Sequence, residues 1–211
     1  MILKFKYDLE KDVYNYLAIT GTKNKGGSSR VLDLLLLKHP DWLNHDDIKK
    51  WIPGYVSYNK FNIDQKLVSI QKSWEKIETE FIERANKIFK IDFPLSEITA
   101  YLTTADRCTI GDKYFFVTIH GQQQNRIIMH ELLHFYTYVI FEKEFSKLNE
   151  KQIYDVKETM TELLNLEFSD LIENPDVGYP MHTELREKFR NFWQEEKDIK
   201  RTVNGLIDLI K

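Results

Sequence analysis

The sequence has little of several features that would place it in a class at once. It has one cysteine, Cys108, so no disulfide can form within the chain, which is compatible with a reducing compartment. No apolar run approaches the roughly 20 residues that a membrane-spanning helix needs. The first residues, MILKFKYDLEKDVYNY, contain no apolar core of a secretory signal. We therefore expect a cytoplasmic protein with no membrane partner.

The chain also lacks an excess of charge of either sign. It has 30 Lys and Arg residues and 33 Asp and Glu residues, for a net charge of -3, and the two signs are interspersed along the sequence. Because nucleic-acid binding requires clustered Lys and Arg residues, we expect no nucleic-acid partner. With 211 residues, 42% of them hydrophobic, the chain can bury a sizeable core in one large domain or two small ones. These numbers predict no oligomeric state.

The first 60 residues are expected to form a mostly helical region of unknown role. Glycine and proline are few, with 8 and 5 residues, and they mark the expected breaks. In chain order we expect a strand at 2–7, a helix at 9–18, a mobile surface loop at 21–30, a helix between Ser29 and Pro40, and a break at Pro53–Gly54.

The rest of the chain alternates between helical and strand-like patterns. Apolar residues recur at spacings of three and four through 62–90, which predicts one long amphipathic helix. The following elements are expected to be strands at 96–104 and 113–121 joined by a hairpin, then helices at 124–142, 151–170 and 182–211, the last with a break near Gly205. Residues 173–180 separate the last two helices. Helices, a small sheet and further helices predict an α+β fold.

One short motif indicates chemistry. His130-Glu131-Leu132-Leu133-His134 has the pattern H-E-x-x-H, and residues four apart lie on the same face of a helix. Two imidazoles placed in this way can bind one zinc ion, and Glu131, about 100° further round the helix, can lie beside a water on the metal. The surrounding residues are apolar, so this helix is expected to be buried. The alternative is a pair of core histidines that find hydrogen bonds within the protein.

A third zinc ligand is expected on the following helix. Glu158 and Glu162 are again four residues apart, within a segment that otherwise packs inward. One carboxylate can bind the metal, and the other can accept a hydrogen bond from a ligand histidine. The alternative is a solvated acidic face that pairs with Lys151 or Lys157.

Together these residues resemble the gluzincins, the thermolysin-like class of zinc metallopeptidases. The resemblance covers about residues 96–170 and rests on IIMHELLHFY, followed 24 residues after His134 by Glu158 in KETMTE. It implies that Glu158 is the third ligand and that Glu162 supports the first histidine, with Glu162 as the other candidate ligand. The chain departs from the class at Lys157, where these enzymes usually carry asparagine.

The resemblance also implies a zincin-like domain over residues 61–211. Residues 62–90 would be its long backing helix, and Tyr114–His120 its exposed edge strand, to which a peptide substrate can add. In this class a His or Tyr after the third ligand often stabilises the oxyanion that forms during hydrolysis. Here Tyr179 and His182 lie in the corresponding part of the chain.

The leading hypothesis is therefore a zinc-dependent peptidase that acts on a peptide or protein substrate. Zinc would be held by His130, His134 and Glu158, with Glu131 as general base. The sequence does not distinguish an active from a latent enzyme, and an alternative is a non-catalytic protein that uses the zincin scaffold for binding or regulation. A di-iron carboxylate bundle is a third interpretation, because Glu131 and His134 also form the motif E-x-x-H. Such bundles need this motif twice, and this chain has it once.

Overall fold

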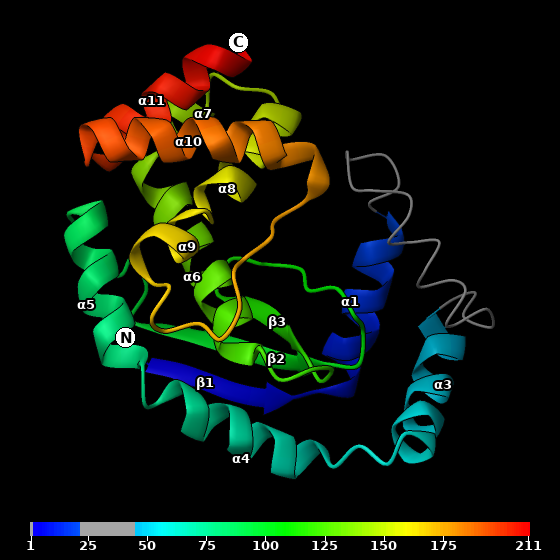
Figure 1. The fold of residues 1–211 in the computed structure, drawn as a ribbon. Helices are drawn as coiled ribbons and strands as arrows, with labels where there is room; N and C mark the ends of the chain where they lie inside the picture. The colour runs from blue at the N-terminus through cyan, green and yellow to red at the C-terminus, as the bar shows by residue number, and fades with distance from the viewer. Residues whose placement is uncertain (1, 22–44) are drawn as a thin grey trace. The chain divides into compact units, whose positions relative to one another are not determined.

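The computed structural model describes residues 2–21 and 45–211. They form an α+β structure that is mostly helical and contains a small parallel sheet (Figure 1). The helix expected between Ser29 and Pro40, and all but the first residue of the loop expected at 21–30, lie outside the described residues. No described helix has the length and apolar character needed to cross a membrane.

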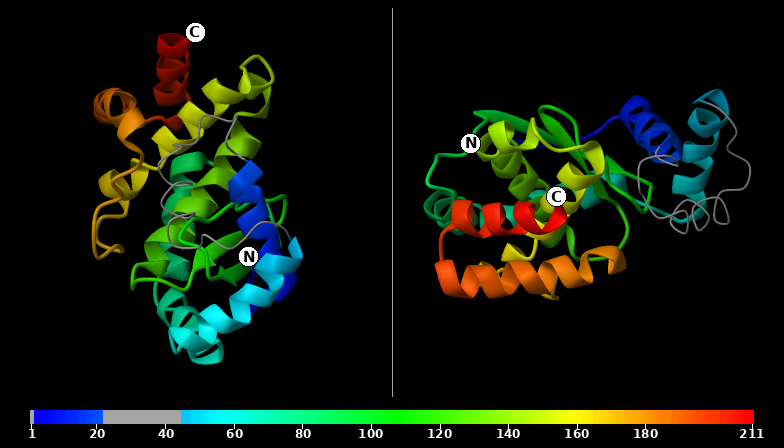
Figure 2. Two further views of the ribbon diagram at one scale, coloured as in Figure 1. Left: turned by 90° about the vertical axis from the view of Figure 1, so that its right-hand side faces the viewer. Right: turned by 90° about the horizontal axis from the view of Figure 1, so that it is seen from above.

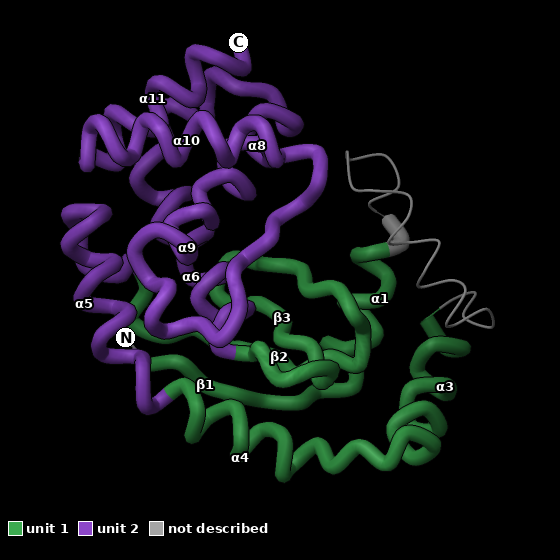
Figure 3. The backbone as a smooth tube through the Cα atoms, in the orientation of Figure 1, with its two compact units in different colours: residues 1–74, 95–124 green, residues 75–94, 125–211 purple. Residues whose placement is uncertain are grey.

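The chain divides into two compact units, each built from two separate stretches of sequence. The first unit contains residues 1–74 and 95–124, and the second contains residues 75–94 and 125–211 (Figure 3). The first unit therefore draws on both sides of the boundary expected near residue 60.

The sheet lies in the first unit and has three strands. They are β1 (Ile2–Tyr7), β2 (Glu97–Thr103) and β3 (Tyr114–Thr118), in the order β1-β2-β3. All three positions agree with the strands expected from sequence. However, β2 and β3 are parallel, with Thr99 opposite Tyr114, so the hairpin expected between them is wrong.

The segment between β2 and β3 runs back beside β3 before it enters that strand. Ile110 forms an isolated antiparallel bridge with Phe115. The Phe116 N–H donates to the carbonyl of Thr109, and the Gly111 N–H donates to the carbonyl of Tyr114. A tight turn is present at residues 111–114, but it joins this return segment to β3 and does not join β2 to β3. The return segment also covers the first part of β3's outer edge, where a peptide was expected to add.

Two helices of the first unit pack their apolar faces together. Helices α1 (Leu9–Gly21) and α3 (His45–Tyr58) share a core that includes Tyr16, Ile48 and Ile52. Pro53 lies inside α3, so the break expected there is wrong. Proline costs the helix a backbone hydrogen bond, but burial of two isoleucines one turn apart favours a continuous helix.

The long helix expected at 62–90 is two helices, which is a second correction. Helix α4 (Ile63–Trp74) ends in the first unit, and α5 (Glu78–Phe89) begins in the second. The apolar spacing continues across residues 75–77, although their backbone forms a turn. Periodicity alone could not reveal this break, because neither side of it contains a proline or glycine and the two helices bury their stripes in different units.

The second unit is otherwise helical. Its helices after α5 are α6 (Gln124–Ile140), α7 (Glu142–Phe145), α8 (Glu150–Met160), α9 (Leu163–Glu167), the 3-10 turn η2 (Pro180–His182), α10 (Thr183–Glu196) and α11 (Ile199–Ile210). Helices α10 and α11 lie side by side and both contact α8 (Figure 2). The segment 151–170 is thus two helices, and the C-terminal break lies at Lys197, in a left-handed conformation, while Gly205 is inside α11.

Candidate metal centre

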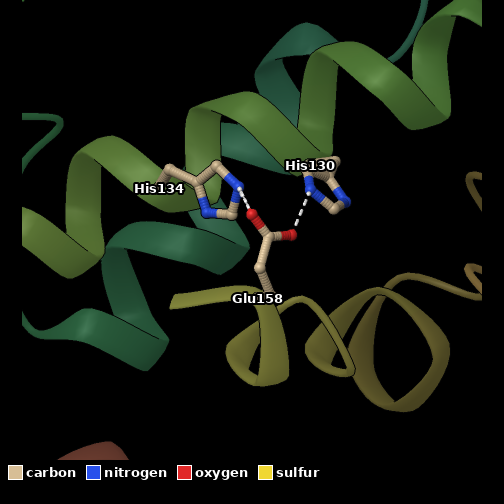
Figure 4. Close-up of side chains that lie close together, drawn as sticks. All are labelled: His130, His134 and Glu158. Carbon is tan, nitrogen blue, oxygen red and sulfur yellow. Dashed lines mark ion pairs between the residues drawn. The ribbon is translucent and has the colours of Figure 1, made fainter. Parts of the chain in front are cut away.

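Helix α6 carries the two motif histidines on one face. The ring centroids of His130 and His134 are 4.7 Å apart, and their planes are nearly perpendicular. Both imidazoles face Glu158 near the end of α8, and each points toward a different oxygen of its carboxylate (Figure 4). Helix α8 begins with a capping box in which Asn149 accepts from the Gln152 backbone, so its start is well defined.

The spacing of these three side chains fits a metal ion. Nε2 of His130 lies 3.4 Å from Oε2 of Glu158, and Nε2 of His134 lies 3.7 Å from Oε1. One ligand atom from each residue lies within 4.8 Å of the other two. Two atoms bound to one tetrahedral zinc ion at about 2.0–2.1 Å lie about 3.3 Å apart, so little movement would bring all three into contact with it. Two imidazoles and one carboxylate also leave a fourth position for water or substrate.

Glu158 faces the two histidines and also forms an ion pair with a lysine. Nζ of Lys157 lies 2.7 Å from Oε1 of Glu158, and both side chains are buried. The sequence allowed a pairing of this lysine with an acidic residue on a solvated face. The pairing exists, but it lies inside the unit and at the candidate ligand.

A buried aspartate lies beside the other ring nitrogen of His130. Nδ1 of His130 is 3.5 Å from Oδ1 of Asp176, in the connection between α9 and η2. The same oxygen accepts a hydrogen bond from Arg126 at 2.8 Å, and Oδ2 accepts from Thr161 at 3.0 Å. Asp176 therefore occupies the place, next to the first histidine of the motif, that the resemblance assigned to Glu162.

Glu162 instead forms ion pairs with two arginines of α10. Its Oε2 lies 2.7 Å from Nη2 of Arg186, and its Oε1 lies 2.7 Å from Nη2 of Arg190. Asn165 donates a further hydrogen bond to Oε2. Glu162 joins α9 to α10, and the arginine pairs account for both of its oxygens.

The charges and the burial around the site favour different protonation states for the two histidines. Burial lowers the pKa of His130, but the carboxylates of Asp176 and Glu158 raise it to about 10. Burial and the nearby Lys157 hold the pKa of His134 well below its usual value. Without a metal, His130 is thus an imidazolium between two carboxylates, and His134 is a neutral imidazole. Metal binding must displace the proton of His130.

Glu131 follows His130 on α6 and is also buried. Burial raises its pKa to about 7, although the charges of His130 and Lys157 act in the opposite direction. A carboxylate with a pKa near neutrality can both accept and return a proton at physiological pH. This property suits the general-base role that the motif predicts.

Tyr179 and His182 form a separate group with the first half of α8. Nε2 of the buried His182 lies 3.0 Å from Oδ1 of Asp155. The Tyr179 ring is 5.9 Å from the His182 ring and 6.1 Å from the ring of Tyr154. Nε2 of His182 is therefore engaged in a hydrogen-bond contact with Asp155. The role of either residue in stabilising an oxyanion stays a prediction.

Sequence reasoning missed Asp176 as a partner of His130 and Lys157 as a buried partner of Glu158. Neither residue belongs to a periodic pattern that would reveal it.

Comparison of the chain with protein-family models, with curated proteins and with solved structures found no match.

Proposed function

We propose that this protein is a zinc-dependent peptidase in which His130, His134 and Glu158 hold the metal. The observation that carries the proposal is the convergence of two imidazoles and one carboxylate from two helices at the spacing of tetrahedral ligands. The buried Glu131, adjacent in sequence to the first histidine, adds a proton acceptor with a pKa of about 7. A purely structural ion-pair network would not need this combination.

The chemistry divides between the metal and the residues of the chain. His130, His134 and Glu158 would hold the zinc ion, which would supply Lewis acidity toward a peptide carbonyl and a water molecule. Glu131 takes the proton that the water loses and delivers it to the leaving amine. Asp176 holds the ring of His130 through its Nδ1, and the charge of Lys157 keeps Glu158 ionised.

A second candidate is a non-catalytic binding protein with the same metal site. It is favoured by the return segment along β3, because two backbone groups at that strand's outer edge are already bonded. If a peptide must add to this edge, the first part of β3 cannot receive it. This candidate retains zinc and lacks hydrolysis, so it differs from the first in one measurable property.

The first test is the zinc content of protein purified without added metal. We expect about one zinc per chain, with loss of it in His130→Ala and in His134→Ala. His45→Ala is the matched control, because His45 is exposed, pairs with Glu10 and belongs to the first unit. Zinc retained in both motif variants would overturn the site, and two iron ions per chain would favour a di-iron protein.

The second arm of the test separates metal binding from hydrolysis. Glu131→Gln should keep zinc, because Glu131 is not one of the three converging ligands. Its amide cannot accept a proton, so cleavage of a mixed peptide library should fall by about 10²–10⁴-fold. Unchanged cleavage would remove Glu131 as the base. Zinc binding without cleavage in the unaltered protein would favour the non-catalytic candidate.

A further inference from the structure

A buried lysine touches the candidate metal ligand, and the proposed hydrolysis gives it no chemical step. The side chain of Lys157 is only 10% exposed. A buried ammonium group needs a partner, and Glu158 is its ion-pair partner within the part of the chain that the structure describes. The Lys157 ammonium also lies over the ring of Tyr154, at 5.4 Å from the centroid. Lys157 is thus held in place at the metal centre.

The two oxygens of Glu158 have different surroundings. Oε1 is 2.7 Å from Nζ of Lys157 and 3.7 Å from Nε2 of His134, whereas Oε2 faces His130 at 3.4 Å. A metal bound through both oxygens would compete with the ammonium for Oε1. A metal bound through Oε2 alone leaves the ion pair of Lys157 intact.

Apart from the two histidines, the charged side chains around the site balance each other. Four carboxylates are linked by ion pairs or lie next to the motif, and four cationic side chains accompany them. The carboxylates are Glu131, Glu158, Glu162 and Asp176, and the cations are Arg126, Lys157, Arg186 and Arg190. A divalent ion therefore adds positive charge to a neutral network, and the nearby ammonium weakens its binding.

We propose that Lys157 is a positioning residue that limits Glu158 to ligation through one oxygen and lowers the affinity of the site for zinc. The inference rests on the proposed zinc site. In the absence of metal, the ammonium serves as the counter-charge of Glu158. With metal bound, it holds Oε1 and keeps a coordination position open for water or substrate.

The test compares two substitutions that remove the charge in different ways. Lys157→Met removes the charge and the hydrogen-bond donors, whereas Lys157→Gln removes the charge but keeps a donor for Oε1. Both variants should bind zinc at least about tenfold more tightly than the unaltered protein, measured by competition with a chelator. Lys151→Met is the control, since Lys151 lies on the same helix, is exposed and pairs with Asp155.

The coordination of the metal gives a second readout that does not depend on activity. With cobalt(II) in place of zinc, the unaltered protein and Lys157→Gln should give the strong visible absorption of a four-coordinate ion. Lys157→Met should give the weaker absorption of a higher coordination number, because Oε1 is then free to bind. This difference separates a positioning role from a general effect on folding.

The outcomes distinguish this inference from the proposed function. If the unaltered protein and the Lys151→Met control bind zinc but the Lys157 variants show unchanged or weaker affinity, the inference is wrong and the zinc site stands. An unchanged cobalt spectrum in Lys157→Met would reject one-oxygen ligation by the same reasoning. If Lys157→Met does not fold, Lys157→Gln still decides the charge effect. If the unaltered protein binds no zinc, both proposals are overturned.

Discussion

At the scale of single residues, His130 is held from two sides by carboxylates that come from different parts of the chain. Glu158 lies near its Nε2 and Asp176 near its Nδ1. Asp176 is itself fixed by Arg126 and Arg186, so it cannot rotate freely. Such partners set the tautomer and orientation of a ligand histidine and increase its basicity.

We therefore expect Asp176→Asn to weaken zinc binding by about 10–100-fold, the usual cost of losing such a partner. The asparagine keeps the size of the side chain but removes the charge that favours the N–H of His130. Glu162→Gln is the matched control, since Glu162 pairs with the arginines of α10. Zinc affinity measured by chelator competition should change far less in the control. A larger loss in Glu162→Gln than in Asp176→Asn would restore Glu162 as the partner of His130.

The sequence allowed part of this site to be predicted. The spacing of four between His130 and His134 places them on one face of any helix, and the structure has them there. The following inward-packing helix offered Glu158 and Glu162 as candidates for the third ligand, and the resemblance to the gluzincins favoured Glu158. Asp176 was not predicted, because it lies in a connection without periodicity, and its position depends on contacts with Arg126 and Arg186 that are distant in sequence.

At the scale of secondary-structure elements, periodicity located most strands and helices but not how they join. The strand patterns of β2 and β3 were read correctly, whereas their parallel pairing depends on the return segment through Ile110. The apolar spacing of three and four does continue through 62–90. The chain nevertheless turns at 75–77, because α4 and α5 belong to different units. These features depend on contacts between distant residues, which a local pattern does not contain.

A buried carboxylate joins two elements of the first unit. Asp12 of α1 accepts hydrogen bonds from the hydroxyl of Thr103 at 2.6 Å and from the backbone N–H of Thr104 at 3.0 Å. Burial raises the pKa of Asp12 to about 6, although these hydrogen bonds lower it. The folded protein therefore holds this proton more tightly than the unfolded chain, in which the pKa is near 3.8.

It follows that Asp12 should make stability depend on pH in a defined window. Its stabilising contribution is fully present below pH 3.8 and is lost as pH rises through about 6. Relative to Asp12→Asn, which does not titrate, the free energy of unfolding of the unaltered protein should fall by about 3 kcal/mol over this window. Denaturant unfolding at several pH values measures the difference. The exposed Asp64→Asn is the control, and a constant offset between the unaltered protein and Asp12→Asn would contradict the prediction.

At the scale of the whole molecule, the sheet and the candidate metal centre belong to different compact units. All three converging ligands, together with Lys157 and Asp176, lie in the second unit, whereas the three strands lie in the first. Each unit contains two stretches of sequence, so the division could not be read from composition or from a linker. One consequence is that metal binding should stabilise one unit directly.

Hydrogen exchange can locate this stabilisation. A ligand that binds only the folded form at 100 times its dissociation constant stabilises that form by about 2.7 kcal/mol, equivalent to about 100-fold slower exchange through unfolding. We expect zinc to slow amide exchange in α6 and α8, which carry the ligands, when the protein is compared with and without the metal by mass spectrometry. His134→Ala is the control, because it removes one of the three ligands and alanine is a strong helix former. If zinc slows exchange equally in His134→Ala, or acts on other segments and leaves α6 and α8 unchanged, the metal binds elsewhere. Slower exchange confined to α6, α8 and the connection that contains Asp176 would support a metal centre in which Asp176 also takes part.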